Sequence, residues 1–104
     1  MGSPGPYIDE EAIVSLTRGL VHCDTSNPPG NEEAAAHFLG DHLAHEGIAV
    51  EYVQVEPDRA ILLARLPGRE RTGSVVLSGH LDAVPAQESG WTYDPFTVRA
   101  LIIP

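Results

Sequence analysis

The most informative segment of the sequence is Ser74-Val75-Val76-Leu77-Ser78-Gly79-His80-Leu81-Asp82-Ala83-Val84-Pro85. Its apolar start, from Val75 to Leu77, has no polar interruption and predicts a short buried strand. Gly79 permits a turn or a close backbone approach where that strand ends. His80 and Asp82 then lie where the strand meets its loop, which is where open α/β sheets usually carry their chemistry.

Two interpretations of His80 and Asp82 follow from their residue types. A neutral histidine nitrogen can bind a metal ion, and a neighbouring carboxylate can fix the orientation of the ring. The alternative is a hydrogen-bonded polar pair at the end of a strand, because His-x-Asp is a common pattern. The residues that follow this pair favour the metal site.

Two spaced blocks of sequence carry a family resemblance. The first block is Ser78-Gly79-His80-Leu81-Asp82-Ala83-Val84-Pro85-Ala86, and the second is Trp91-Thr92-Tyr93-Asp94-Pro95-Phe96. In this order they resemble the first metal-ligand segment of the co-catalytic zinc amidohydrolases. That family includes acetylornithine deacetylase, succinyl-diaminopimelate desuccinylase, aminoacylase and the glutamate carboxypeptidases. The loop from Asn27 to Glu32 also resembles the loop after the first helix of this family, and we expect it to act as a rigid elbow.

The resemblance implies a fold, a cofactor and two site residues. The fold would be the N-terminal part of a zinc-exopeptidase-like catalytic domain. His80 would be a zinc ligand, and Asp82 would be the catalytic carboxylate that orients the metal site. In the intact family two zinc ions activate a water and polarise an amide carbonyl, and a separate Glu is the general base. The substrate would be a small-molecule amide, either a peptide or an N-acyl amino acid, and the intact enzyme could be a homodimer.

The resemblance covers residues 8–96 and lacks the family's later ligands. A catalytic zinc site normally needs three protein ligands, and this chain offers one credible ligand and one supporting carboxylate. We therefore expect a truncated or frame-shifted piece of a hydrolase that is inactive alone and binds zinc weakly. The alternatives are a small non-catalytic α/β domain with a binding or vestigial role, and a chance motif in an unrelated α/β protein.

Local patterns predict an α/β order of elements along the chain. Residues 1–7 are expected to be a disordered lead-in, and residues 8–104 form the truncated domain. Helices are predicted at residues 8–22 and 32–46, the second with Asn31 as its N-cap and Gly47 just after its end. Strands are predicted at residues 48–55 and 60–66, as an antiparallel hairpin, and at 74–79. Together they would form two helices followed by an incomplete mixed sheet.

Two further groups of residues have a structural and a functional interpretation. The three histidines of the second predicted helix are His37, His42 and His45. Their spacing does not place all three on one face, so we expect surface residues rather than a metal site. The aromatic and proline block holds Trp91, Tyr93, Pro95 and Phe96. We expect this block to pack the loop onto the sheet rather than to contact substrate.

Composition limits the classes of partner. The chain has 104 residues, with 6 Lys and Arg, 15 Asp and Glu and a formal net charge of -9. This acidity argues against nucleic acid or an anionic membrane as a partner. The one cysteine, Cys23, allows no disulfide within the chain. No apolar run reaches the length of a membrane span, and the N-terminus lacks signal-peptide features, so we expect a cytoplasmic protein.

Overall fold

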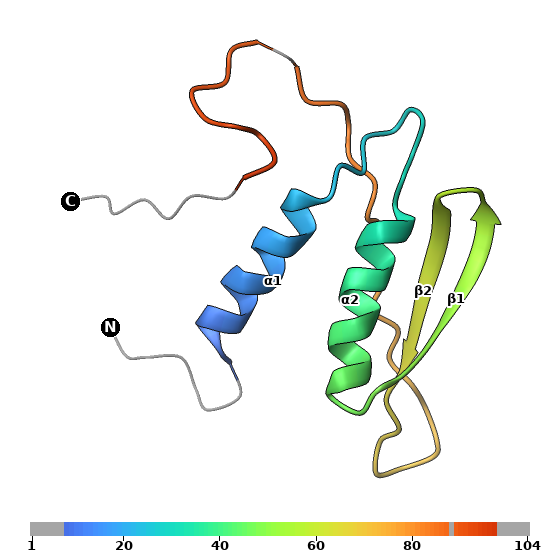
Figure 1. Ribbon diagram of the computed structural model, residues 1–104. Helices are drawn as coiled ribbons and strands as arrows, with labels where there is room; N and C mark the ends of the chain where they lie inside the picture. Colours follow the sequence, from blue (N-terminus) through green and yellow to red (C-terminus); the bar gives the residue numbers. More distant parts are fainter. Residues whose placement is uncertain (1–7, 88, 98–104) are drawn as a thin grey trace.

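The computed structural model describes residues 8–87 and 89–97. Its elements are α1 (Glu10–His22), α2 (Glu33–His45), β1 (Ala49–Glu56) and β2 (Arg59–Arg65). Helix α2 lies between α1 and the β1–β2 hairpin and packs against both (Figure 1). The observed fold is a small α/β arrangement in which both predicted helices and the predicted antiparallel hairpin are confirmed. The predicted disordered lead-in, residues 1–7, lies outside the described residues.

The starts of the two helices are stabilised in different ways. Asp9 is the N-cap of α1, and its side chain accepts a hydrogen bond of 3.1 Å from the Ala12 N–H. The predicted N-cap of α2, Asn31, is wrong, because that position belongs to Glu32, which makes no side-chain cap bond. The first exposed donor of α2, the Glu33 N–H, instead donates to the Asp58 carbonyl at 3.0 Å. A backbone carbonyl of the hairpin turn therefore accepts the hydrogen bond that a capping side chain would otherwise accept.

The hairpin presents one side to α2 and leaves the other side uncovered. Tyr52 of β1 lies against Gly40 of α2 and stacks on His37, with ring centroids 4.1 Å apart. Ala60 of β2 is buried. On the other side of the sheet, the larger apolar side chains stay about half exposed: Val53, Val55, Ile61 and Leu63. Tyr52 is therefore a point at which β1 and α2 approach each other closely.

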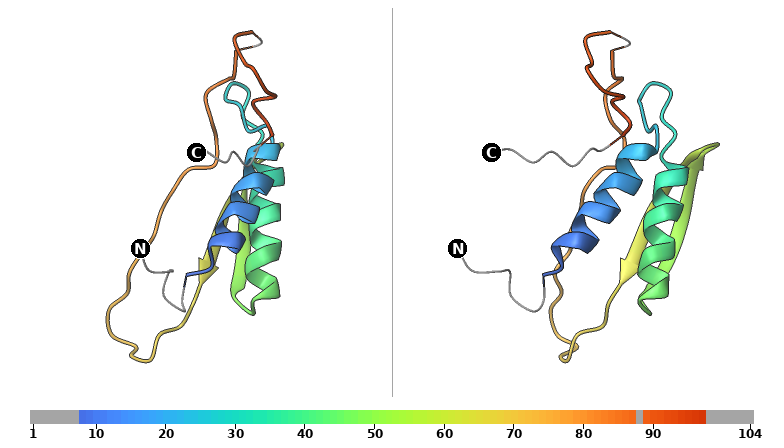
Figure 2. Two further views of the ribbon diagram at one scale, coloured as in Figure 1. Left: turned by 90° about the vertical axis from the view of Figure 1, so that its left-hand side faces the viewer. Right: turned by 60° about the vertical axis from the view of Figure 1, so that its left-hand side comes forward.

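The predicted third strand, residues 74–79, is not observed. Val75, Val76 and Leu77 are 87%, 83% and 92% exposed. A buried strand needs a hydrogen-bonded neighbour and covered faces, and no other described segment supplies them here. Figure 2 shows this part of the chain running apart from the helices. The sheet of the described residues is therefore two-stranded and antiparallel, and the mixed sheet predicted from the sequence is wrong.

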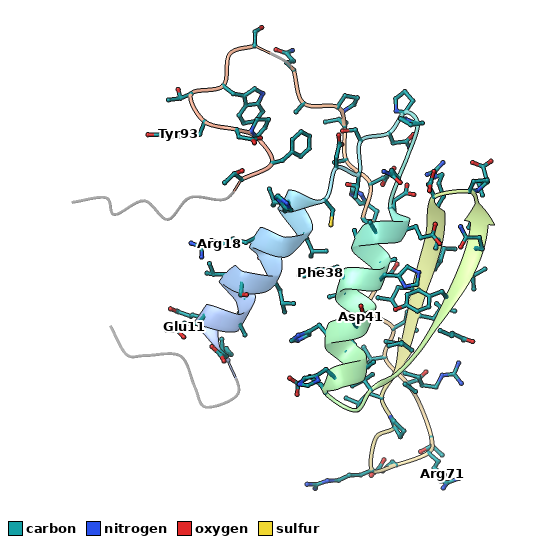
Figure 3. All side chains as sticks on the ribbon, viewed as in Figure 1. Glu11, Arg18, Phe38, Asp41, Arg71 and Tyr93 are labelled. Atoms are coloured by element: carbon teal, nitrogen blue, oxygen red, sulfur yellow. The ribbon has the colours of Figure 1, made fainter. Side chains whose placement is uncertain are left out.

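The core is small and lies around α2. The buried apolar residues of the described chain are Ala35, Ala36 and Ala60. Phe38 lies between the helices, with its ring against Gly19 of α1 (Figure 3). No residue of α1 is buried, and Ile13 on its predicted apolar face is 54% exposed. No helix in the described part of the chain is long and apolar enough to cross a membrane.

Candidate functional site

The structure places His80 and Asp82 in direct contact. The His80 Nδ1 atom lies 2.8 Å from the backbone carbonyl oxygen of Asp82 and 3.1 Å from its Oδ1 atom. Both oxygens can only accept, so in the neutral imidazole Nδ1 carries the hydrogen. The lone pair is then on Nε2, which is the atom left to bind a metal. The His80 side chain is 85% exposed, so Nε2 is accessible.

The other carboxylate oxygen of Asp82 is held by a residue far away in sequence. The Asn27 side-chain amide donates from Nδ2 to Asp82 Oδ2 at 2.9 Å. The Asn27 N–H donates to the Ala83 carbonyl at 2.8 Å, and the Ala83 N–H donates to the Thr25 carbonyl at 3.1 Å. These bonds form a parallel bridge between Ser26 and Ala83. The loop after α1 therefore lies directly on the segment that carries the site.

The same loop is tied to β2 by an ion pair. Arg59 donates from Nη2 to Glu32 Oε1 at 2.8 Å and from Nε to both carboxylate oxygens at 3.1 and 3.2 Å. The Glu32 side chain is only 10% exposed. Gly30 has a φ of +83°, and a Cβ there would lie 2.6 Å from Arg59 Nε. A glycine at position 30 therefore permits both the backbone turn and the approach of the guanidinium.

Hydrogen bonds and nearby charges favour the ionised carboxylates. The Asn27 amide lowers the pKa of Asp82, and His80 and the Arg59 charge lower it further, against a smaller opposing effect of desolvation. The hydrogen bonds from Arg59 lower the pKa of Glu32, while desolvation and the charge of Asp82 oppose this. Both side chains are therefore carboxylates at neutral pH. Asp82 can act as an acceptor that orients His80.

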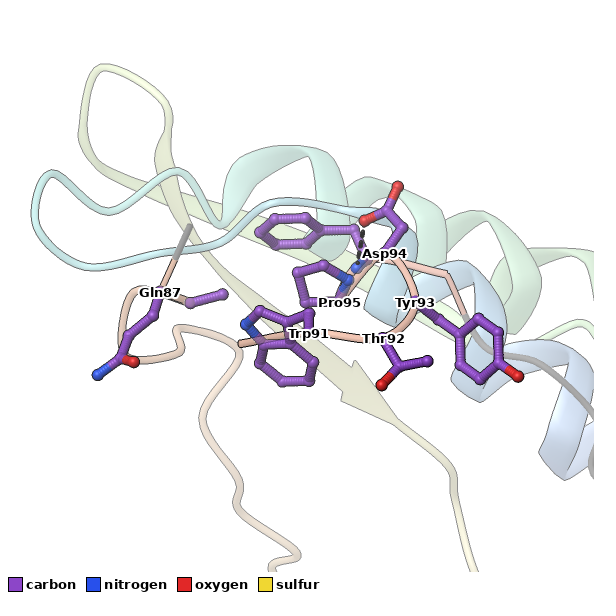
Figure 4. Close-up of a pocket in the computed structure, with 8 residues that line it drawn as sticks. Gln87, Trp91, Thr92, Tyr93, Asp94 and Pro95 are labelled. Carbon is purple, nitrogen blue, oxygen red and sulfur yellow. Dashed lines mark hydrogen bonds between the residues drawn. The ribbon is translucent and has the colours of Figure 1, made fainter. Parts of the chain in front are cut away.

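The aromatic block after the site does not pack onto the sheet. Trp91 and Tyr93 are 56% and 48% exposed, and Pro95 and Phe96 are half-buried. They line an open hollow of about 470 Å³, in which the Phe96 N–H donates to Asp94 Oδ1 at 2.9 Å (Figure 4). This segment lies beyond the C-terminal end of α1, whereas the hairpin lies on the far side of α2 (Figure 1). The predicted packing onto the sheet is therefore wrong.

A second, larger hollow continues from the aromatic block to α1. It has a volume of about 710 Å³ and is mostly apolar. Its α1 side is formed by Leu20 and Val21, with Cys23 just after the helix. The loop with Trp91 and Phe96 forms its other side. The block thus packs loosely over the end of α1.

The histidines of α2 differ in their contacts and in their exposure. His37 stacks on Tyr52 and has its Nε2 atom 3.9 Å from Glu33 Oε1. His42 is half-buried and His45 is exposed. In residues 8–87 and 89–97, no three His, Cys, Asp or Glu side chains are grouped so as to hold a metal ion. Within that part of the chain, the pair of His80 and Asp82 therefore has no third metal-ligating side chain grouped with it.

The chain is similar to known amide hydrolases over most of its length. Aminoacylase-1 of Pongo abelii and of Homo sapiens are each 31% identical over 97 residues, which are 92% of this chain and 24% of the relative. Acetylornithine deacetylase of Vibrio cholerae is 35% identical over 85 residues, which are 82% of this chain and 21% of the relative. No family model matches the chain. No solved structure matches it either.

These relatives carry the names of the family that the two sequence blocks indicate. The chain spans about a fifth to a quarter of the length of the curated relatives it matches. The chain belongs to the family of aminoacylase-1 and acetylornithine deacetylase.

Proposed function

We propose that this chain is the N-terminal part of the catalytic domain of a zinc-dependent amide hydrolase, with His80 as its first metal ligand. The observation that supports this most strongly is the contact between His80 Nδ1 and the two oxygens of Asp82. This contact selects the tautomer whose Nε2 atom can bind a metal. Paired carboxylate and histidine groups of this kind are typical of protein zinc ligands.

In this proposal the described residues supply one zinc ligand, His80, and the carboxylate that orients it, Asp82. When bound, zinc would polarise the amide carbonyl and activate a water molecule. His80 would bind the ion through Nε2, and Asp82 would hold the ring and increase the basicity of that nitrogen. The relatives are several times longer than the matched segment, which leaves room in an intact enzyme for further ligands, a second zinc ion and a general base.

The substrate class follows from the relatives' names. Aminoacylase-1 and acetylornithine deacetylase are named for removing acyl groups from amino acids. We therefore place the bond to be cleaved in an N-acyl amino acid or a peptide. The exposed position of His80 is consistent with a ligand that faces a substrate cleft.

A chimeric enzyme tests this function. The matched 85-residue segment of the Vibrio cholerae acetylornithine deacetylase is replaced by the corresponding residues of this chain. We expect zinc-dependent release of acetate from N-acetylornithine, and we expect His80→Ala to abolish it. His45→Ala, a change of an exposed histidine in α2, is the matched control and should leave the activity intact.

Two results would count against the proposal. One is a chimera that keeps its activity and its zinc after His80→Ala. The other is a folded chimera that binds no zinc and releases no acetate, which would favour the non-catalytic binding domain. Zinc content is measured by elemental analysis and folding by circular dichroism on the same samples, so that loss of metal and loss of fold are separated.

A further inference from the structure

The contacts of Asp82 point to a residue that acts on the site from the loop between the helices. We propose that Asn27 is a positioning residue, which holds the Asp82 carboxylate and through it the His80 ring, so that Nε2 faces outward. The proposal rests on the proposed role of His80 as a metal ligand. It assigns to the loop at residues 25–32 a function beyond that of a rigid elbow.

The carboxylate of Asp82 is fixed because its two oxygens have different partners. Oδ1 lies 3.1 Å from His80 Nδ1, and Oδ2 accepts from Asn27 Nδ2 at 2.9 Å. Rotation of the carboxylate about its Cβ–Cγ bond would stretch both contacts together. Without Asn27, and among the residues that the structure describes, the contact with an exposed imidazole would be the remaining hydrogen bond that opposes this rotation. The Asn27 side-chain amide therefore restricts rotation of the Asp82 carboxylate, and this carboxylate in turn orients the His80 ring.

Backbone hydrogen bonds fix the position of Asn27. Its N–H donates to the Ala83 carbonyl at 2.8 Å, and the neighbouring bond from the Ala83 N–H to Thr25 lies in the same bridge. Thr25 is 6% exposed, so this part of the loop is buried. The loop is anchored again at Glu32 by the ion pair with Arg59. An amide side chain that starts from such a fixed backbone can direct its donor at Asp82.

The contact with Asp82 requires a hydrogen-bond donor at position 27. The variants that test it are therefore those that remove this donor. Asn27→Ala removes the donor, and Asn27→Asp replaces it with an oxygen that repels the Asp82 carboxylate. Asn31 lies in the same loop, is exposed, and has no part in the contacts with Asp82 and Ala83 described above. Asn31→Ala and Asn31→Asp are therefore matched controls for the loss of the amide and for the added charge.

The first measurement is the tautomer ratio of His80 in metal-free chain, by ¹⁵N NMR at about pH 8.5, where imidazoles are neutral. We expect the Nδ1–H form to dominate in the unmodified chain. Asn27→Ala should lower its ratio to the Nε2–H form about fivefold, which corresponds to one hydrogen bond of about 1 kcal/mol. Asn27→Asp should lower it further, and both Asn31 variants should leave it unchanged. The His37 signals report whether the α2–hairpin packing is retained.

The second measurement needs no variant, so it holds even if Asn27→Ala does not fold. The side-chain amide protons of Asn27 should exchange with solvent more slowly than those of Asn31, because one of the Asn27 protons is donated to Asp82 Oδ2. Equal exchange, or a His80 tautomer ratio that is the same in Asn27→Ala, would overturn the positioning role. Neither readout uses a metal. If both results are as expected but zinc does not bind at His80, Asn27 still positions the pair and the proposed function is what fails.

Discussion

Substitution of Gly40 by alanine should destabilise the protein, although glycine is a poor residue inside a helix. A Cβ at position 40 would lie 2.8 Å from Cζ and 3.1 Å from Cε1 of Tyr52, with the Tyr52 hydroxyl closer still. Both atoms belong to the ring that stacks on His37. The new methyl group must therefore displace the ring from its stack or push α2 away from β1.

The magnitude is the balance of two opposing effects. Alanine at a helix interior position is worth about 1 kcal/mol over glycine. Overpacking a close contact costs about 1–3 kcal/mol, and losing an aromatic stack costs about 0.5–1.5 kcal/mol. We expect Gly40→Ala to lower the free energy of unfolding by about 2 kcal/mol, which corresponds to a fall in Tm of roughly 8 °C for a chain of this size.

Urea unfolding followed by circular dichroism measures this change. Asp41 is exposed and lies next to Gly40. The difference in unfolding free energy between Asp41→Ala and Asp41→Gly gives the helix propensity of alanine over glycine within α2. In a Tyr52→Leu background the ring is absent. Gly40→Ala should then increase the free energy of unfolding by nearly the helix propensity difference measured at position 41. A stabilising Gly40→Ala in the presence of Tyr52 would refute the close packing of α2 on β1.

Three further predictions concern the loop and the site. Arg59→Ala should speed amide hydrogen exchange at Asn27, because it removes the ion pair that joins the loop to β2. Arg65→Ala, at the exposed end of β2, should leave the exchange rate unchanged. Equal exchange rates in the two variants would contradict this. The pKa of Glu32 is lowered in the folded state by Arg59, so its contribution to stability is present above the ordinary value of 4.5 and is lost as the pH falls below it. Urea unfolding from pH 7 to pH 3 should show this fall, and Glu32→Gln should flatten it. The chain alone should retain well under one zinc per molecule after dialysis against a chelator, and stoichiometric zinc by elemental analysis would contradict the incomplete site.

Patterns that act over a few residues predict most of the elements. The apolar spacing of the helices and the short turn of the hairpin depend on neighbours in sequence, and each appears close to its predicted range. The glycine after α2 also behaves as expected, because Gly47 has a φ of +83° and its N–H donates to the Ala44 carbonyl at 2.9 Å. Gly40 is an unfavourable residue for a helix interior, and the close approach of Tyr52 gives a packing reason for it.

Features that depend on distant partners were not predictable in the same way. An apolar run such as residues 74–79 has strand character, but a strand forms only beside a neighbour, and the described chain has none there. The N-cap of α2 differs because the Glu33 N–H finds the Asp58 carbonyl in the hairpin turn. Asn27 meets Asp82 across 55 residues of sequence, and no local signal indicates that contact. The motif singles out His80 and Asp82, which the structure places in contact, while their role at a metal site stays a prediction.

Titration of zinc into the metal-free chain, observed on the ¹⁵N signals of its 5 histidines, tests the central assignment most directly. We expect Nε2 of His80 to respond first, and we expect Asp82→Asn to weaken the zinc affinity about tenfold or more through loss of the orienting carboxylate. A first response at any of the other four histidines, or an affinity unchanged by Asp82→Asn, would contradict this assignment.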